Sequence, residues 1–489
     1  MPTESKTARV AAAVRAMIHD GRLREGDALP STRALAAELG VARGTVVAAY
    51  EQLDGEGYIT TRHGTLARVA ASLARLPVTA PGQGAEPRAA AAPGSAGVQA
   101  PADVQGPADT DAAELIDLTP GVPAVTSISE RDWRAAWRHA AAATLRNAYP
   151  DPLGEPEPRG EIAKQLGFSR GFAPDTGRVI VTGGTAEALS LLAEALGPRP
   201  RIAVENPGYR SGRRALASAS AQLVPIALDE HGLRLDALAA AHARHPLAAV
   251  SVTPSHQYPS GAVMPIGRRH ELLEWAAAEG VVVIEDDYDS EFRHHGAPLP
   301  ALAAIDRAGV VVHIGSFSKV LNPQLRCGYL VVPPDGPAAG AVRRARLARG
   351  AVVATPTQHA LAWLMRTGAL RRHVARLRRE YTHRRALVAD ALSGLPGVTV
   401  GALGGGLHAA VQWHDERDER AVVADIRRRG VIVAPLSLYA VEGSGLETRG
   451  FVLGYGPVSA TTLATALAQI VAELSSRPAV QGDARSAPR

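Results

Sequence analysis

The chain has 489 residues, a formal net charge of +5 and a single cysteine, Cys327. This length exceeds what one ordinary hydrophobic core holds, so we expect two or three domains. One cysteine excludes an intramolecular disulfide, and neither a signal-peptide pattern nor an apolar run of about eighteen residues occurs, so we expect a soluble cytoplasmic protein without a membrane partner. The modest charge says little about nucleic acid.

The first 70 residues predict three short helices. Ser31, after a proline, is a typical start for the second helix, and Gly40 supplies its left-handed stop. The apolar residues that share the inner face of each helix are Val10, Val14, Met17 and Ile18, then Leu35 and Leu39, then Val46, Tyr50 and Leu53. Two short helices joined by a glycine-containing turn predict a helix-turn-helix.

The second helix of such a motif enters the major groove of DNA by its N-terminal end, which here carries Arg43 and Thr45. Arg33, at the start of the preceding helix, and Arg62, in the segment TTRHG expected to form a β-wing, can reach backbone phosphates. The alternative is a three-helix interaction domain with solvated arginines, since this geometry is weakly encoded.

The segment LPSTRALAAELGVARGTVVAAYEQLDGEGYITTRHG resembles the winged helix-turn-helix of GntR-type transcription regulators over nearly all of residues 7 to 70. The resemblance implies double-stranded DNA as a partner. The wing departs from the family pattern, because RHGTLARVA is shorter than the usual glycine-rich turn.

Composition then divides the chain. Residues 71 to 115 are rich in Ala, Pro and Gly and hold few large apolar residues, which predicts a long disordered linker between domains at 1–70 and 116–475. Residues 476–489 are expected to form a disordered tail.

The large domain alternates candidate strands with helical stretches such as TAEALSLLAEAL. This alternation predicts an α/β fold with a mostly parallel sheet covered by helices on both faces. The candidate strands are 178–184, 201–209, 248–261, 281–292, 310–315 and 328–333.

Chemistry-bearing residues follow these strands. Gly183, Gly184, Thr185 and Ala186 open a helix, where free N–H groups favour an anion. After the next strand, Tyr209 has a ring that can stack on a flat cofactor or belong to the core.

An acidic cluster, EDDYD, follows the strand before residue 285 and contains Asp286 and Tyr288. Buried carboxylates need a cation or hydrogen-bond donors, and a protonated pyridine nitrogen is one such partner.

Lys319 follows the strand that ends near Gly315, at the sheet edge where ligands bind in open α/β folds. Ser316, Ser318 and Arg326 can supply hydroxyls and a guanidinium to a phosphate. A lysine beside a phosphate site is typical of pyridoxal 5'-phosphate proteins, although a solvated loop lysine is the simpler alternative.

These motifs, in this order, resemble a fold type I, aspartate-aminotransferase-like domain from about residue 116 to 475, with a smaller α+β subdomain. Together with the N-terminal domain they resemble the MocR/PdxR group of regulators, on the segments VTPSHQYPSG, IEDDYDSEF and GSFSKVLNPQLRCGY. The resemblance implies pyridoxal phosphate as cofactor and a homodimer.

The resemblance also implies roles for single residues. Lys319 is expected to form the internal aldimine, Asp286 to pair with the pyridine nitrogen, Tyr288 to contact the ring hydroxyl and Tyr209 to stack on the ring. The residues expected to hold the phosphate are Gly184, Thr185, Ser316 and Arg326, with Tyr149 reaching a phosphate across a dimer interface. Ala186, Ser318 and His256 are also expected to contact the cofactor. Tyr258 stands where the enzymes have an asparagine, so that His256 or Gln257 has to supply any replacement contact.

The late segment FVLGYG places Val452 where aminotransferases carry a substrate-binding arginine, and Arg449 points to the other face of an extended strand. We therefore expect weak transamination or none, and a transcription regulator that senses pyridoxal phosphate, or an amine that forms an external aldimine with it. The dimer would grip two half-sites of an operator through its long linkers. The alternatives are an active aminotransferase that carries a DNA-binding domain, and a DNA-binding scaffold that holds the cofactor for stability alone.

Overall fold

The structure is a computed structural model. It describes residues 6–19, 22–24, 26–55, 58–60, 66–69, 115–294 and 300–476. Residues 71–114 of the predicted linker, Arg62 and the tail from residue 477 on lie outside these residues. Among the described residues, no helix is long and apolar enough to cross a membrane.

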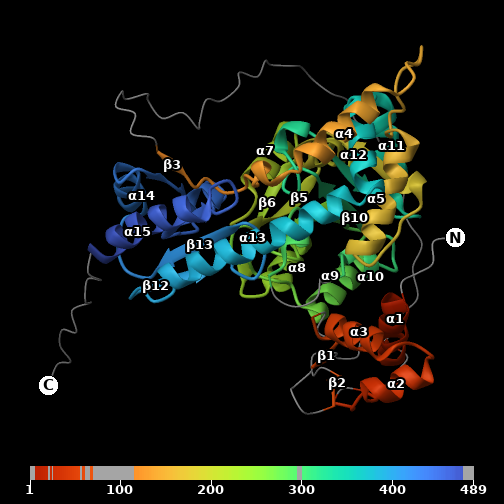
Figure 1. The fold of residues 1–489 in the computed structure, drawn as a ribbon, viewed down its shortest axis with the longest axis horizontal. Coiled ribbons are helices and arrows are strands. Elements are labelled where there is room, and N and C mark those ends of the chain that lie inside the picture. Colours follow the sequence, from red (N-terminus) through yellow and green to blue (C-terminus); the bar gives the residue numbers. More distant parts are fainter. Residues whose placement is uncertain are drawn as a thin grey trace.

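The N-terminal domain has the three predicted helices and a short antiparallel pair of strands (Figure 1). Ser31 caps the second helix by accepting a hydrogen bond from the amide of Ala34 at 3.2 Å, as its position predicts. The elements are α1 (Lys6–His19), α2 (Thr32–Glu38), α3 (Arg43–Gly55), β1 (Ile59–Thr60) and β2 (Arg68–Val69). Val10, Val14, Leu35, Val46 and Leu53 form its core.

An eight-stranded sheet, in the order β4-β11-β10-β9-β8-β5-β6-β7, organises the large domain. The strands from β10 to β6 pair in parallel, whereas β11 is antiparallel to both its neighbours and β7 is antiparallel to β6. The strands are β4 (Val179–Thr182), β5 (Arg201–Asn206), β6 (Gln222–Asp229), β7 (Gly232–Leu233), β8 (Ala249–Val252), β9 (Val282–Asp287), β10 (Val311–Ser316) and β11 (Gly328–Val331). This confirms the predicted mostly parallel sheet.

Helices cover both faces of this sheet. Successive residues of a strand point to opposite faces, so neighbouring residues of β9 pack against different helices. Val282 and Ile284 pack in one core with α6 and α11, whereas Val283 between them packs in another core with α8 and α9. The helices are α4 (Glu130–Ala141), α5 (Pro156–Ser169), α6 (Thr185–Ala195), α7 (Arg210–Ser218), α8 (Leu235–Arg244), α9 (Ile266–Glu279), α10 (Leu302–Ile305), α11 (Pro337–Arg349) and α12 (Thr355–Arg366). Single 3-10 turns lie at Val125–Ser127, Thr176–Arg178, Ser290–Phe292 and Pro323–Leu325.

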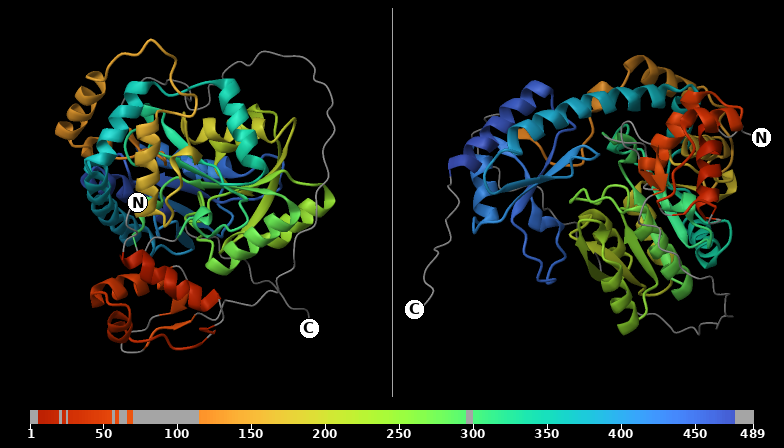
Figure 2. Two further views of the ribbon diagram at one scale, coloured as in Figure 1. Left: turned by 90° about the vertical axis from the view of Figure 1, so that its right-hand side faces the viewer. Right: turned by 90° about the horizontal axis from the view of Figure 1, so that it is seen from below.

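The long helix α13 (Ala369–Leu392) connects the large domain to a smaller C-terminal α+β subdomain (Figures 1 and 2). Its antiparallel sheet has the order β12-β13-β16-β15, and β14 pairs in parallel with β3 from the start of the large domain. The elements are β3 (Ile116–Asp117), β12 (Val398–Gly401), β13 (His408–Trp413), α14 (Glu419–Arg428), β14 (Val431–Ile432), β15 (Ala434–Pro435), the 3-10 turn η5 (Leu436–Tyr439), β16 (Gly450–Gly454) and α15 (Ala460–Ser476).

Candidate cofactor pocket

One cavity of about 450 Å³ lies at the carboxyl ends of the parallel strands, between the large domain and the C-terminal subdomain. It brings together nine of the residues singled out in the sequence: Thr185, Ala186, Tyr209, Asp286, Tyr288, Ser316, Ser318, Lys319 and Arg326. The fold therefore collects side chains that are far apart along the chain into one place.

Lys319 lies just after β10, and its ammonium group donates a hydrogen bond to the carbonyl of Gly121. A Cβ atom at Gly121, whose φ is +94°, would lie only 2.8 Å from Nζ, so glycine leaves room for the lysine. Burial lowers the pKa of Lys319, and the carboxylates of Asp289 and Asp286 oppose this. A lysine whose pKa is lowered by burial holds more of its amine in the neutral, nucleophilic form.

Asp286, near the end of β9, faces the same cavity from a buried position. Burial raises its pKa to about 8, and the neighbouring acids Asp287, Glu205 and Asp289 add to this. Its Oδ1 atom is buried without a hydrogen-bond partner among the described residues. A buried carboxyl oxygen without a partner fits a ligand that brings an N–H group to it.

A second part of the cavity lining, here called the anion end, suits an anion. Gly184, with φ +95°, precedes the first turn of α6, whose free N–H groups favour negative charge. A Cβ atom at Gly184 would lie 3.9 Å from the guanidinium of Arg326, so the cation stands beside the helix end. Ser316 accepts a hydrogen bond from the amide of Ser318 at 3.1 Å, which shapes the loop carrying both hydroxyls.

Tyrosines also line the cavity. The ring of Tyr258 makes edge contacts with Tyr209, Tyr288 and Tyr439, at centroid distances of 6.3, 5.7 and 5.3 Å. Burial raises the pKa of Tyr209 to about 12, so its hydroxyl stays protonated near neutral pH. The wall is therefore uncharged and aromatic, which suits a flat ring.

Neither residue considered as a replacement for the enzymes' asparagine lines the cavity. Gln257 is buried and donates to the carboxylate of Glu205 at 3.2 Å and to the carbonyl of Pro207 at 3.0 Å. Burial raises the pKa of Glu205 to about 7 despite the hydrogen bonds that it accepts. Gln257 thus holds the loop before Pro259 against β5 instead of facing the cavity.

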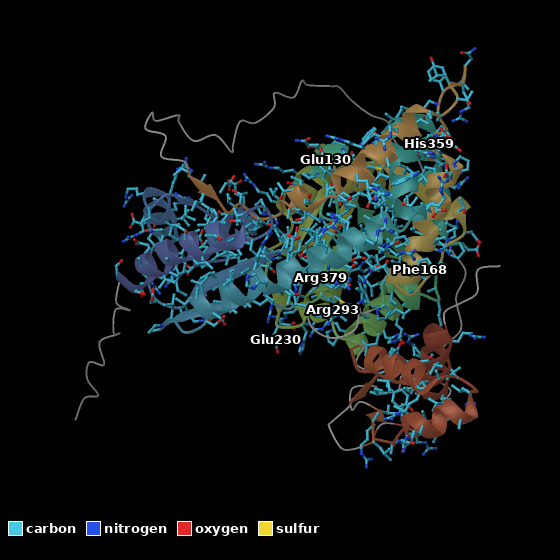
Figure 3. The ribbon with its side chains drawn as sticks, viewed as in Figure 1. Glu130, Phe168, Glu230, Arg293, His359 and Arg379 are labelled. Atoms are coloured by element: carbon cyan, nitrogen blue, oxygen red, sulfur yellow. The ribbon has the colours of Figure 1, made fainter. Side chains whose placement is uncertain are left out.

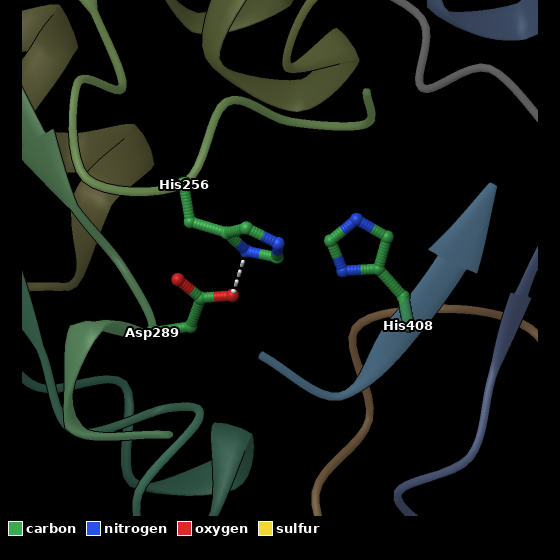
Figure 4. Close-up of side chains that lie close together, drawn as sticks. All are labelled: His256, Asp289 and His408. Carbon is green, nitrogen blue, oxygen red and sulfur yellow. Dashed lines mark hydrogen bonds and ion pairs between the residues drawn. The ribbon is translucent and has the colours of Figure 1, made fainter. Parts of the chain in front are cut away.

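His256, which we predicted as a cofactor contact, lies behind the wall beside Asp289 and His408 (Figure 4). Its Nδ1 is 2.9 Å from Asp289 Oδ2 and 3.1 Å from the hydroxyl of Tyr288, and its Nε2 faces the carbonyl of Ala402 at 3.3 Å. A carboxylate and a carbonyl both accept hydrogen bonds, so each ring nitrogen of His256 has an acceptor within reach.

The three side chains have the composition of a metal site, and their ligand atoms lie within 4.8 Å of one another. Both ring nitrogens of His256 already lie beside hydrogen-bond acceptors, however, and His408 Nε2 is committed to the carbonyl of Pro259 at 3.2 Å. Burial and the nearby His256 lower the pKa of His408 to about 3, which keeps its ring neutral. We interpret the group as a hydrogen-bonded support for Tyr288.

Several pocket residues come from segments that the sequence did not single out. Residues 119–121 form one edge, and His408, Leu438 and Tyr439 come from the C-terminal subdomain. Of these residues, only His408 stands out in the sequence, as a lone histidine in the apolar strand LHAAVQW.

Tyr149 lies away from the cavity. It is fully exposed, as is Leu145 at 97%, on the segment that projects after α4 (Figures 1 and 3).

The predicted DNA contacts that the structure describes lie at the start of α2 and α3. Arg33 and Arg43 are exposed, and Arg43 Nε is 3.4 Å from the hydroxyl of Thr32. Thr45 is half-buried in the first turn of α3. Arg62 lies outside the described residues.

Comparison with known proteins identifies both parts of the chain. Residues 6–69 match the family described as bacterial regulatory proteins, gntR family, and residues 113–447 match aminotransferase class I and II. The chain belongs to the GntR-type regulators that carry an aminotransferase domain.

Among relatives of this regulator, the HTH-type pyridoxine biosynthesis transcriptional regulator PdxR of Corynebacterium glutamicum is 38% identical, over 94% of this chain and 93% of the relative. The HTH-type transcriptional regulator TauR of Rhodobacter capsulatus is 34% identical over 94% of both chains. The probable rhizopine catabolism regulatory protein MocR of Rhizobium meliloti is 31% identical over 92% of this chain and 90% of the relative.

The aminotransferase domain of the regulator also resembles solved enzymes. The kynurenine aminotransferase of Pyrococcus horikoshii superposes with a TM-score of 0.66 at 24% identity, covering 74% of this chain and 91% of the enzyme. This likeness confirms the fold type I architecture. The cofactor of the aminotransferase class is pyridoxal phosphate, and the lysine, the buried acid without a partner and the anion end of the cavity fit it.

Proposed function

We propose that this regulator binds DNA through residues 6–69, the DNA reader, and responds to pyridoxal phosphate, or to an amine captured by it, in the pocket around Lys319. The observation that carries the proposal is the pocket itself, in which the lysine, the acid and the anion end stand together. The name of the Corynebacterium relative refers to pyridoxine biosynthesis, which supports vitamin B6 metabolism as the regulated process.

Different residues of the pocket bind different parts of the cofactor. Lys319 offers the amine for covalent attachment, Arg326 and the first turn of α6 take the phosphate, and Tyr209 covers the ring face. In the cofactor-free protein Asp286 is largely protonated near neutral pH, so it already holds the proton that a pyridine nitrogen needs. The cofactor, when bound, supplies an aldehyde that joins amines and a ring that withdraws electrons.

DNA binding is assigned mainly to the N-terminal ends of α2 and α3. Arg43 and Thr45 face base edges in the major groove, and Arg33 and Arg62 contact phosphates. Two readers in a homodimer bind two half-sites, since linked binding raises the effective concentration of the second reader.

The homodimer is supported by the projecting segment after α4. A soluble protein seldom leaves two large apolar side chains fully exposed on one loop, and Leu145 and Tyr149 are such a pair. We infer that a second copy covers them, with Tyr149 reaching the partner's phosphate site.

Transamination is expected to be weak or absent. Val452 is fully buried in β16 and packs in a cluster with Leu436 and Tyr439 beside the cavity. Arg449 is bound elsewhere, to the carbonyl of Asp415 at 2.6 Å. Neither Val452 nor Arg449 therefore supplies a guanidinium at the predicted carboxylate site, and a bidentate clamp is hard to replace.

A titration of DNA from the gene's own upstream region tests the proposal. Fluorescence anisotropy at one fixed salt concentration compares apo protein, protein with pyridoxal phosphate, and Lys319→Ala with and without it. We expect the cofactor to change DNA affinity or stoichiometry for the wild type and not for the variant. Identical binding by apo and loaded wild type would refute sensing of the bare cofactor, and steady keto-acid formation from an amino donor would instead support the enzyme.

A further inference from the structure

The DNA reader rests on the aminotransferase domain at the start of α9 (Figure 1). The hydroxyl of Tyr58 lies 3.2 Å from Nε2 of His270, and the two rings meet edge to face, 6.4 Å apart. Tyr58 and Ile59 are fully buried, and their core includes Ile266 from α9, with Ile305 from α10 packed against it. The contact therefore combines apolar burial with a directed hydrogen bond.

The first connection from this surface to the cofactor pocket is Arg269, beside His270. Its guanidinium is completely buried and donates to the carbonyls of Pro254, Met264 and Pro300, each at 2.8 Å. The loop after Pro254 carries Tyr258 into the pocket wall. A buried cation bonded to three carbonyls ties the start of α9 to that loop, because losing any one bond would leave a buried group unpaired.

The second connection runs through α10. The amides of Leu302 and Ala303 donate to the carboxylate of Glu285, at 2.6 and 3.1 Å. Glu285 is fully buried, accepts from His313 at 2.9 Å and directly precedes Asp286 in β9. The helix that carries Ile305 to the reader is thus anchored one residue from the acid that faces the pocket.

We propose that the surface formed by the start of α9 and by α10 is the docking site of the chain's own DNA reader, and that this docking depends on the state of the cofactor pocket. The proposal rests on the function proposed above and deepens it, since it names the surface through which the pocket acts on the reader. Arg33 and Arg43 stay exposed while the reader is docked, so docking fixes the direction of the DNA-binding surface without covering it.

Photo-crosslinking in the full chain tests the docking. Benzoylphenylalanine replaces Tyr58, and mass spectrometry locates the peptide that it joins. We expect a product between position 58 and α9 that runs at the mass of one chain, with a yield that changes at least about two-fold when pyridoxal phosphate is added. Absence of a link to α9, a link at the mass of two chains, or a yield indifferent to the cofactor would each overturn the proposal.

A pair of charge variants tests the coupling. Ile266→Asp puts a carboxylate into the apolar contact at the first residue of α9, and Ala277→Asp adds the same charge at an exposed position of the same helix. We expect Ile266→Asp to keep the visible absorbance of the bound cofactor and basal DNA binding, and to lose the cofactor-dependent change in DNA affinity. Ala277→Asp should behave as wild type.

A full cofactor-dependent change in Ile266→Asp would refute the coupling while leaving the proposed function intact. A wild type without such a change would refute the function, and the crosslink would still decide whether the reader docks.

Discussion

The hydroxyl of Tyr258 donates a hydrogen bond to that of Tyr439 across 3.3 Å, joining the large domain to the C-terminal subdomain over the cofactor pocket. Arg213 strengthens the same junction by donating to the carbonyl of Tyr439 at 2.7 Å. Val452 packs behind Tyr439 in the cluster that also contacts Tyr258. The position of the missing arginine is therefore filled by packed side chains.

Restoring the arginine should destabilise the protein without creating a transaminase. Val452→Arg buries an unpaired charge in a filled site, and we expect a loss of about 2 kcal/mol or more in the free energy of unfolding, measured by urea denaturation. Gln412→Arg, at an exposed position of the neighbouring strand, is the control and should lose little. A stable Val452→Arg protein that converts L-amino acids to keto acids would show that the site is open after all.

The raised pKa of Asp286, about 8, predicts a pH dependence of stability for the cofactor-free protein. Between about pH 4 and 8 the folded state binds more protons than the unfolded state, so this group's contribution to stability falls as the pH rises. We expect the wild type to lose stability relative to Asp286→Asn from pH 5 to pH 8, by at most about 1.4 kcal/mol per pH unit. Urea denaturation at four pH values measures this difference, and a constant difference would contradict the protonated carboxyl.

Substitutions of Arg33 and Arg43, two of the exposed arginines of the reader, should affect DNA binding in different ways. Arg43→Ala removes a contact to base edges, so we expect a loss of roughly tenfold or more in specific affinity and a smaller loss on unrelated DNA. Arg33→Ala removes a phosphate contact and should weaken both equally, with a salt slope smaller by about 1. Gel-shift titrations at several salt concentrations separate these outcomes. Arg214→Ala, exposed on α7, is the control, and equal effects of both reader variants would contradict the assignment.

The projecting segment after α4 predicts the behaviour of the dimer. Leu145→Asp should shift the protein toward monomers in sedimentation velocity, because a carboxylate would have to be buried at the interface. Leu446→Asp, at a position 40% exposed in the loop before β16, serves as the control and should leave the assembly unchanged. A Leu145→Asp protein with the wild-type sedimentation coefficient would place the interface elsewhere.

Local patterns predicted the sheet and the segments that carry the pocket. The β-branched run before Gly315 and the acidic cluster after residue 284 mark strand ends, and strand ends of a parallel sheet share one edge. The sequence overestimated some strands, however. The run 248–261 becomes β8 only as far as Val252, because the prolines at 254 and 259 remove ladder donors and turn the chain away.

The features that the sequence did not predict depend on contacts between distant parts of the chain. Gly121 meets Lys319, His408 stands beside His256, and Tyr58 meets His270 only after the subdomains pack. A lone histidine in an apolar strand or an exposed-looking tyrosine before a wing carries no local signal of its partner. His256 illustrates the limit, since its neighbours in sequence point to the pocket and its hydrogen bonds place it behind the wall.

The pocket draws its walls from Thr119 through Tyr439, whereas the described reader is complete by Val69. During translation, the reader therefore leaves the ribosome long before the last wall of the pocket exists. A nascent chain therefore has its reader before it can bind the cofactor. A protein truncated anywhere before residue 439 should not respond to pyridoxal phosphate. Such truncation also removes the domain that pairs the two readers, so we expect premature stop codons to abolish the response to the cofactor and to weaken DNA binding together.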